Sequence, residues 1–411
     1  MSKIFSLEGK GLKLDTASDI EPHLQPLKDS SDVEEVRLQG NTLGIEACAA
    51  LASVLSTKKS LRIANLADIF TSRLLSEIPP SLTSLLQACL SLPNLHTIDL
   101  SDNAFGLNTV EPLRPFLSQH VPLQHLILNN NGLGPAAGTL VAEALTLLAE
   151  KKAQARAEGR DVPDLETVVC GRNRLENGSM KAWAAAYTAN SGVKEVRMTQ
   201  DGIRQEGIVV LLREGLANCK GLETLDLQDN TFTKMGSAAL AEVASGGAWV
   251  AMRELGLGDC LLSARGAVQI AKGLTTGNMK GLEVLRVQFN EFRKETLKLL
   301  AEGLGELPRL RRVEVNGNQF EEKDESLEKI REVLGSRREE AGEEEGEMWG
   351  IDELEDLEDE DSDEDDETED EEDEEEEKIL KEADAAEDEP AAAGEDKEVD
   401  ELAAKLGKTG I

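Results

Sequence analysis

A short pattern recurs along most of this chain and constrains its fold more than any other feature. Apolar residues and an asparagine follow one another in the order LxxLxLxxNxL. The clearest copies are LHTIDLSDNAF, LQHLILNNNGL, LETVVCGRNRL, LETLDLQDNTF, LEVLRVQFNEF and LRRVEVNGNQF, and VEEVRLQGNTL is an earlier one. Such repetition predicts an array in which each unit buries its apolar side against its neighbours.

The spacing of the units identifies their type. Asn131 and Asn173 are 42 residues apart, and the later steps, which end at Asn318, are 28, 29, 30, 30 and 28 residues long. This period is typical of long leucine-rich repeats, and each unit has room for a strand, a loop and a full helix. About ten or eleven units are expected.

The predicted fold class is therefore α/β, a leucine-rich-repeat solenoid built like ribonuclease inhibitor, with inner parallel strands and outer helices. We expect residues 1–335 to form this domain, closed by a capping helix that begins after Asp324. Residues 336–411 are expected to be an acidic, largely disordered tail. Glu339–Glu377 holds 28 acidic residues among 39 and no Lys or Arg. Charges of the same sign repel one another, so this segment is not expected to collapse into a core.

Two short segments interrupt the acidic tail. MWGIDEL surrounds Trp349, and VDELAAKL spans Val399 to Leu406. Each is interpreted either as a docking peptide or as an incidental cluster of apolar residues.

The asparagine of the pattern has a structural role. Its amide is expected to turn inward and bind backbone groups that the curve of the solenoid leaves unpaired. Two units replace it, by Asp201 and Cys260. The residues assigned to this ladder are Asn41, Asn103, Asn131, Asn173, Asn230, Asn290 and Asn318.

The stretch LILNNNGLGP contains three consecutive asparagines with different expected roles. Asn131 falls in the ladder register, whereas Asn129 and Asn130 come just before it. The framework does not require these two side chains, so they are expected to face the rim where strands pass into helices. Charged residues at the corresponding place in other units, as partner-binding candidates or as solvated rim charges, are Asp102, Arg172, Asp229 and Asp259.

Charge is distributed unevenly. The net charge is -37, and from Glu339 onward there are 38 acidic residues and five lysines, so the first 338 residues are nearly neutral. A polyanionic tail argues against nucleic acid as a partner, because phosphates repel it. No apolar run is long enough for a membrane span, and the first residues do not resemble a signal peptide.

Motifs for bound cofactors are missing from the sequence. The four histidines have no zinc spacing, the five cysteines form no CxxC pair, and no phosphate-binding loop or dinucleotide fingerprint follows a strand. We expect no metal and no cofactor. The scattered, odd number of cysteines favours reduced thiols in a cytosolic or nuclear protein.

Several stretches go beyond the repeat consensus and run in order through nearly all of residues 1–335. They are SLEGKGLKLD, ADIFTSR, EIPPSL, LHTIDLSDNAFG, LNNNGLGP, CGRNRLENGSM, LDLQDNTFT and LGDCLLSARG, and the acidic tail follows them. In these stretches the chain resembles the Ran GTPase-activating proteins in their fungal form.

The resemblance implies a function in nucleocytoplasmic transport. The chain would accelerate hydrolysis of GTP by the small GTPase Ran without being a nucleotide-binding enzyme itself, and GTP and magnesium would belong to Ran. Ran-GTP is the implied partner, with a Ran-binding protein as a further one. A cytoplasmic monomer is expected, with a perinuclear position as an additional expectation.

The resemblance also implies site residues. The catalytic asparagine of the family corresponds to Asn130, which would position the catalytic Gln of Ran without an arginine finger. Arg73 in ADIFTSR would be a docking contact. Two alternatives are that it acts as an arginine finger, for which an arginine side chain is suited, or that it has no part in the interaction. The remaining partner-binding candidates are Asp102, Asn129, Arg172, Asp229 and Asp259.

Two other functions share these features. An inhibitor or scaffold of the ribonuclease-inhibitor type would bind through its concave face, but five cysteines and one tyrosine argue against it. An acidic leucine-rich nuclear protein that binds histones or inhibits a phosphatase has the same body and tail. Its repeats are shorter than 28–30 residues.

Overall fold

The computed structural model describes residues 3–344, 346 and 348–358. The chain divides into two compact units, Met1–Glu360 and Asp361–Ile411. Most of the predicted acidic tail, including Val399–Leu406, lies outside the described residues.

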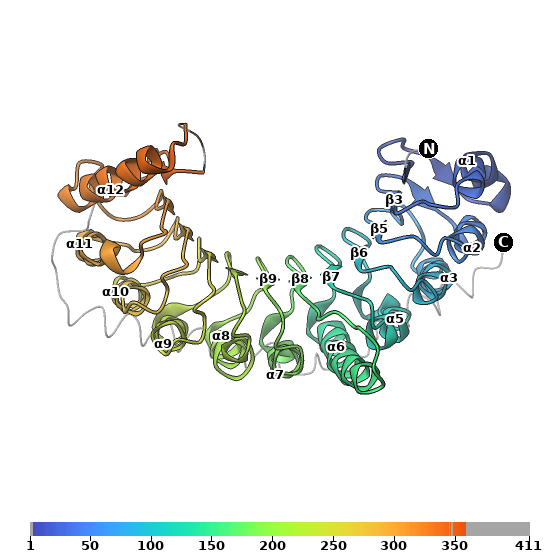
Figure 1. The fold of residues 1–411 in the computed structure, drawn as a ribbon, viewed down its shortest axis with the longest axis horizontal. Coiled ribbons are helices and arrows are strands. Elements are labelled where there is room, and N and C mark those ends of the chain that lie inside the picture. Colours follow the sequence, from blue (N-terminus) through green and yellow to red (C-terminus); the bar gives the residue numbers. More distant parts are fainter. Residues whose placement is uncertain (1–2, 345, 347, 359–411) are drawn as a thin grey trace, which may run out of the picture. The chain divides into compact units, whose positions relative to one another are not determined.

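Within the first unit, short parallel strands form a 12-stranded sheet in sequence order, from β1 through β3 and β5 to β14. The strands line one side of the repeats and the helices line the other (Figure 1). The strands of this sheet are β1 (Ile4–Ser6), β3 (Glu35–Arg37), β5 (Ile63–Asn65), β6 (Thr97–Asp99), β7 (His125–Ile127), β8 (Thr167–Val169), β9 (Glu195–Arg197), β10 (Thr224–Asp226), β11 (Glu254–Gly256), β12 (Val284–Arg286), β13 (Arg312–Glu314) and β14 (Gly350–Ile351). A separate pair joins β2 (Lys13–Leu14) to β4 (Thr42–Leu43).

The helices follow the strands and pack against one another in chain order. They are α1 (Ala17–Asp29), α2 (Ile45–Leu55), α3 (Ile78–Leu90), α4 (Gly106–Thr109), α5 (Leu113–Gln119), α6 (Gly134–Ala157), α7 (Glu176–Ala189), α8 (Gln205–Val210), α9 (Thr233–Ser245), α10 (Ala264–Leu274), α11 (Lys294–Gly303) and α12 (Glu325–Ala341). Short helical turns η1 (Leu211–Gly215), η2 (Leu216–Asn218) and η3 (Leu304–Glu306) complete the set. The predicted α/β leucine-rich-repeat solenoid is confirmed.

The three-residue strands explain the apolar pattern of the sequence. In β7, Leu126 is fully buried, while His125 and Ile127 on either side are half-exposed on the inner face. The register pairs Leu126 with Ile98 of β6 and with Val168 of β8. Because adjacent residues of a strand face opposite sides, each central residue joins the core beneath the helices.

Behind the strands, the ladder asparagines are buried and bind backbone groups of two units at once. The Asn131 side-chain nitrogen donates to the carbonyls of Leu100 and Leu128, both at 3.1 Å. Its side-chain oxygen accepts from the backbone N–H of Asn103 at 2.9 Å. Comparable bonds to neighbouring backbone are made by Asn41, Asn103, Asn173, Asn230, Asn290 and Asn318.

At the carboxyl end of the solenoid, the structure differs from the predicted domain boundary. The helix α12 begins after its N-cap Asp324, as predicted, but runs to Ala341 and so past residue 335. The segment around Trp349 then forms β14, which pairs in parallel with β13. Ile351 and Leu357 pack against the core, so apolar burial holds this acidic segment in the folded unit.

Candidate functional site

One edge of the sheet carries a row of side chains at equivalent positions. The residue three places after each of the strands β3 and β5–β13 has a left-handed backbone, with φ between 45° and 75°. Parallel strands end at the same edge, so these residues line one rim. We call them the rim row: Gly40, Asp68, Asp102, Asn130, Arg172, Gln200, Asp229, Asp259, Phe289 and Gly317.

The side chain of Asn130 is exposed and held from one side. Its nitrogen donates to a carboxylate oxygen of Asp102 at 2.7 Å, and its backbone N–H donates to the carbonyl of Gly171 at 3.0 Å. Because a carboxylate only accepts, this contact settles which end of the amide is the nitrogen. The amide oxygen and the second N–H are left to face solvent, so both hydrogen-bonding functions remain open to a partner.

The neighbouring Asn129 has a framework role that the sequence prediction did not give it. Its side-chain oxygen accepts from the backbone N–H of Gly171 at 2.8 Å, and the residue is half-buried. This bond ties the β7 loop to the next unit. The expectation that the framework does not require Asn129 was wrong, because its position brings the amide against the adjacent backbone.

The guanidinium of Arg73 is engaged within the chain. It lies in the loop after β5, and only 7% of its side chain is exposed. It donates to Oδ1 of Asp15 at 2.5 Å, to the hydroxyl of Thr42 at 2.8 Å and to the carbonyl of Thr42 at 3.0 Å. Glu77 is 3.8 Å away. In this arrangement Arg73 holds its loop against the two amino-terminal units.

The remaining charged rim candidates are exposed, and the structure brings two of them together. Partial desolvation, together with the negative charge of the nearby Asp259, raises the pKa of Asp229. Arg172 is exposed in the unit that follows Asn130. The candidates therefore share one rim, with Asp102, Asn130 and Arg172 in consecutive units.

The inner face of the sheet balances much of its own charge between β9 and β13. Arg197 lies 2.7 Å from Glu195 and 3.4 Å from Asp226. Arg286 lies 3.4 Å from Glu254 and 3.5 Å from Glu314. Because these half-buried charges are already paired with one another, we expect a charged partner to bind at the rim and not at this part of the inner face.

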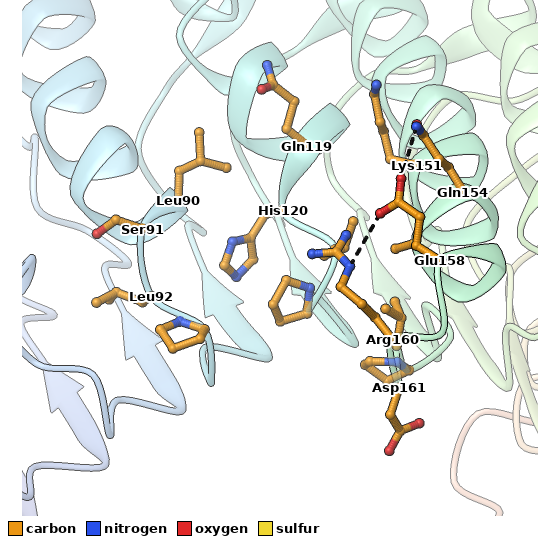
Figure 2. Close-up of a pocket in the computed structure, with 16 residues that line it drawn as sticks. Leu90, Ser91, Leu92, Gln119, His120, Lys151, Gln154, Glu158, Arg160 and Asp161 are labelled. Carbon is orange, nitrogen blue, oxygen red and sulfur yellow. Dashed lines mark hydrogen bonds and ion pairs between the residues drawn. The ribbon is translucent and has the colours of Figure 1, made fainter.

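A cavity of about 660 Å³ lies away from the rim row. It is lined by residues that precede β6, β7 and β8, among them Leu92, His120 and Arg160 (Figure 2). The strands are parallel, so these residues mark the opposite edge of the sheet. Beside the cavity, the buried Lys152 donates to the carbonyls of Val121, Leu123 and Pro163. We therefore interpret this lysine as a structural clamp for the 42-residue unit.

Besides the glycines Gly40 and Gly317, sequence reasoning missed three members of the rim row that have a side chain. Gln200, Phe289 and Asp68 occupy the same register as Asn130, and Phe289 is 52% exposed. The register alone could have selected Phe289 from LRVQFNEF. An apolar residue at a rim position was not recognised as a candidate because apolar residues usually indicate core.

The described residues offer no group of three or more His, Cys, Asp or Glu that could hold a metal ion. Among them there is also no helix of the length and apolarity that crossing a membrane needs. All five cysteines are buried thiols, and burial raises the pKa of Cys48 and Cys89 to about 12.

These features define a leucine-rich-repeat protein with a row of exposed side chains on one edge of its sheet. In the sequence comparison, the chain is 42% identical over 334 residues to Ran GTPase-activating protein 1 of Saccharomyces cerevisiae, which covers 79% of this chain and 80% of that protein. The chain belongs to the Ran GTPase-activating protein family.

Animal relatives match over shorter regions. Ran GTPase-activating protein 1 of Xenopus laevis is 39% identical over 48% of this chain and 34% of its own length. Ran GTPase-activating protein 2 of Caenorhabditis elegans is 38% identical over 50% of this chain and 21% of its own length. No family model matches the chain.

Solved structures with a similar chain path are distant. An internalin from Listeria monocytogenes shares 16% identity, covering 81% of this chain and 77% of that one, with a TM-score of 0.42. The toll-like receptor chain of the TLR13-ssRNA13 complex shares 16% identity, covering 78% and 40%, with a TM-score of 0.43.

Proposed function

We propose that this chain activates GTP hydrolysis by Ran and that Asn130 is the residue that acts on the reacting GTPase. The observation that carries the proposal is the exposed amide of Asn130, oriented by Asp102 on the rim of a member of this family. GTP and magnesium are then supplied by Ran, and the chain needs no cofactor of its own.

The mechanism starts from what limits a GTPase alone. The Gln that orients the attacking water is mobile, so the productive geometry is rarely populated. An amide can donate to the carbonyl of that Gln and accept from its nitrogen at the same time. Asn130 has both functions open on its outer side, because Asp102 takes one N–H. Holding the Gln in place lowers the entropic part of the barrier.

An arginine finger is not part of this mechanism. Arg73 is the chemically suitable residue near the amino-terminal end of the rim, but its three hydrogen bonds hold the guanidinium within the chain. We propose that it supports docking of Ran by holding its loop. Asp102, Arg172, Asp229 and Asp259 are proposed as rim contacts, and Asn129 contributes by fixing the loop that carries Asn130.

The setting proposed for this activity follows from the same family membership. The chain works as a monomer in the cytoplasm, including the perinuclear region, where Ran-GTP leaves the nucleus with a Ran-binding protein. It binds neither nucleic acid nor a membrane for this function.

The test is single-turnover hydrolysis of GTP bound to Ran at saturating concentrations of the chain. Asn130→Ala is expected to lower the maximal rate about 100-fold or more, the scale of losing a positioning contact. Asn130→Gly is expected to lower the maximal rate by the same amount. Glycine adopts the left-handed backbone without strain, so this variant removes the side-chain amide and leaves the loop conformation unchanged. Asn131→Ala serves as the matched framework variant and is expected to lower the melting temperature.

Two results would contradict the mechanism. A normal maximal rate for both Asn130 variants would exclude the amide, and loss of that rate in Arg73→Ala alone would establish an arginine finger. If the wild-type chain does not accelerate hydrolysis at all, the acidic leucine-rich-repeat scaffold that binds histones or inhibits a phosphatase becomes the better assignment, and a histone pull-down would examine it.

A further inference from the structure

Two large apolar side chains stand exposed on the rim, several units beyond Asn130. Leu261 is 59% exposed and Phe289 is 52% exposed. Both have left-handed backbones, with φ of 49° and 53°. Bulky residues rarely adopt this conformation, which is unfavourable for residues other than Gly, Asn and Asp.

Seven of the nine other residues of the rim row avoid this cost, and the two exceptions, Arg172 and Gln200, are polar. Gly40 and Gly317 have no side chain to strain, and Asp68, Asp102 and Asn130 are of the types that tolerate a left-handed backbone. The fold therefore does not require leucine or phenylalanine at these places. A chain that keeps strained, exposed apolar residues where glycine or asparagine would be more stable indicates a function for them.

The neighbouring loop is shaped to support the ring of Phe289. A Cβ added to Gly317 would lie 2.2 Å from Cδ1 of Phe289, so the ring occupies the space that a side chain there would need. One side of the ring rests on this glycine. The half-exposed ring is thus held in place before any partner arrives, and little side-chain freedom is lost on binding.

The two apolar residues lie on adjacent loops, because Leu261 comes two residues after the rim-row residue Asp259 and Phe289 is the rim-row residue of the next unit. Loop contacts tie their units together: the N–H of Asp259 donates to the carbonyl of Gln288 at 2.8 Å, and the N–H of Glu291 donates to that of Leu262 at 3.0 Å. We call Leu261, Phe289 and Asp259 the distal rim patch.

The negative charge beside this patch indicates which kind of partner side chain would bind there. Asp259 and Asp229 are exposed acids of the rim row. The nearby Arg293 is engaged with Gln319 at 3.0 Å, and Glu291 accepts from the N–H of Ala264 at 3.1 Å. An aromatic face next to carboxylates suits a Lys or Arg side chain flanked by apolar residues.

The patch and Asn130 are within reach of a single bound protein. Asp259 and Leu261 are four strand steps from Asn130 and Phe289 is five, which at about 4.8 Å for each step is about 19–24 Å. A domain of about 200 residues, the size of a small GTPase, has a radius of gyration of about 16 Å. A GTPase placed with its Gln at Asn130 is therefore wide enough to reach the distal rim patch.

We propose that the distal rim patch is a second docking site for the GTPase, which binds a basic segment with apolar neighbours on that protein. The patch provides affinity and leaves the chemistry to Asn130. This proposal rests on the proposed function, because the occupant is the same GTPase.

The test measures single-turnover hydrolysis of Ran-bound GTP as a function of chain concentration. Phe289→Asn and Leu261→Asn are each expected to raise the half-saturating concentration about tenfold, the effect of losing one interface anchor, while the maximal rate stays within about twofold. Asparagine relieves the backbone strain, so the melting temperature is expected to be equal or higher in both variants.

The matched control is Val250→Asn. Val250 is 60% exposed, but it precedes β11 and therefore lies toward the opposite edge of the sheet. It is expected to leave the half-saturating concentration unchanged. Asp259→Lys tests the role of charge. It is expected to raise the half-saturating concentration, and the increase should be larger at low salt, where charges are less screened.

Failure of the two proposals gives different results. Suppose that the wild-type chain accelerates hydrolysis and that Phe289→Asn and Leu261→Asn have the same half-saturating concentration as the wild type. The docking site is then overturned and the proposed function stands. An equal shift in Val250→Asn also overturns the site. If the wild-type chain gives no acceleration, both proposals are overturned together.

Discussion

At the residue scale, Asp201 shows how one ladder position tolerates a carboxyl group. It is fully buried, and one of its oxygens accepts from the backbone N–H of Asn173 at 2.8 Å. Its other oxygen is buried and has no hydrogen-bond partner among the described residues. At this place an asparagine would donate to backbone carbonyls, and a protonated carboxyl can do the same. Burial raises the pKa of Asp201 well above its ordinary value, which favours the protonated form.

We expect Asp201→Asn to stabilise the chain in a pH-dependent way. The folded pKa of Asp201 is raised, so its contribution to stability is fully present below the unfolded pKa of about 3.9 and is lost as the pH rises through the folded pKa. The amide does not titrate, so the gain should be about 1–3 kcal/mol near neutral pH and small near pH 4. Urea unfolding of both forms at the two pH values would measure this. An equal effect at both would exclude a protonated carboxyl.

For Arg73, the structure predicts a positioning role that can be separated from direct contact. Arg73→Ala is expected to lower the free energy of unfolding by about 1–3 kcal/mol, because it removes charge-assisted bonds from a side chain that is largely buried. It should raise the half-saturating concentration and preserve the maximal rate. Thr42→Val, which removes only one partner of the guanidinium, should give the same changes with smaller size. A variant with normal stability and a lost maximal rate would contradict this role.

At the element scale, β14 extends the sheet with residues from an acidic segment. Arg311 donates to the carbonyl of Met348 at 2.9 Å and lies 6.0 Å from the ring of Trp349. The carboxylate of Asp352 accepts from the N–H groups of Val315 at 2.7 Å and Asn316 at 3.0 Å. The Asp352 bonds satisfy donors that directly follow β13, and the pairing of β14 with β13 covers a sheet edge that would otherwise be open to another chain.

This arrangement predicts that the segment stabilises the solenoid. A chain that ends after Glu358 should unfold at the same urea concentration as the full chain, whereas one that ends after Ala341 should unfold earlier and self-associate through its open sheet edge. Asp352→Ala should cost about 1–3 kcal/mol, because two N–H groups lose their partner. Glu355→Ala, at an exposed site nearby, is the control. Equal stability of the two shortened chains would show that β14 contributes nothing.

At the scale of the whole molecule, the two edges of the sheet have different contents. The carboxyl edge carries the rim row, with exposed polar and apolar side chains on left-handed loops. The amino edge carries the cavity of about 660 Å³ and the buried Lys152, whose bonds join successive loops. The same parallel arrangement produces both edges, and we propose that only the first one meets the GTPase.

The sequence by itself determined the repeat, its period and its register, because burial of one apolar face requires the same residue types at the same places in every unit. From this the solenoid, the place of Asn131 in the ladder and the rim position of Asn130 could be predicted. The family followed from stretches such as CGRNRLENGSM, which lie outside the repeat consensus.

Only the tertiary structure decided what each rim side chain contacts. The contacts of Arg73 with Asp15, of Asn129 with Gly171 and of Trp349 with Arg311 join residues that lie 58, 42 and 38 positions apart in the sequence. Repeat periodicity specifies which face a residue occupies, but not which neighbour its side chain reaches. The contacts of a side chain depend on how adjacent units stack. Only the structure therefore shows that Arg73 is hydrogen-bonded within the chain, that Asn130 is exposed, and that the ring of Phe289 packs against Gly317.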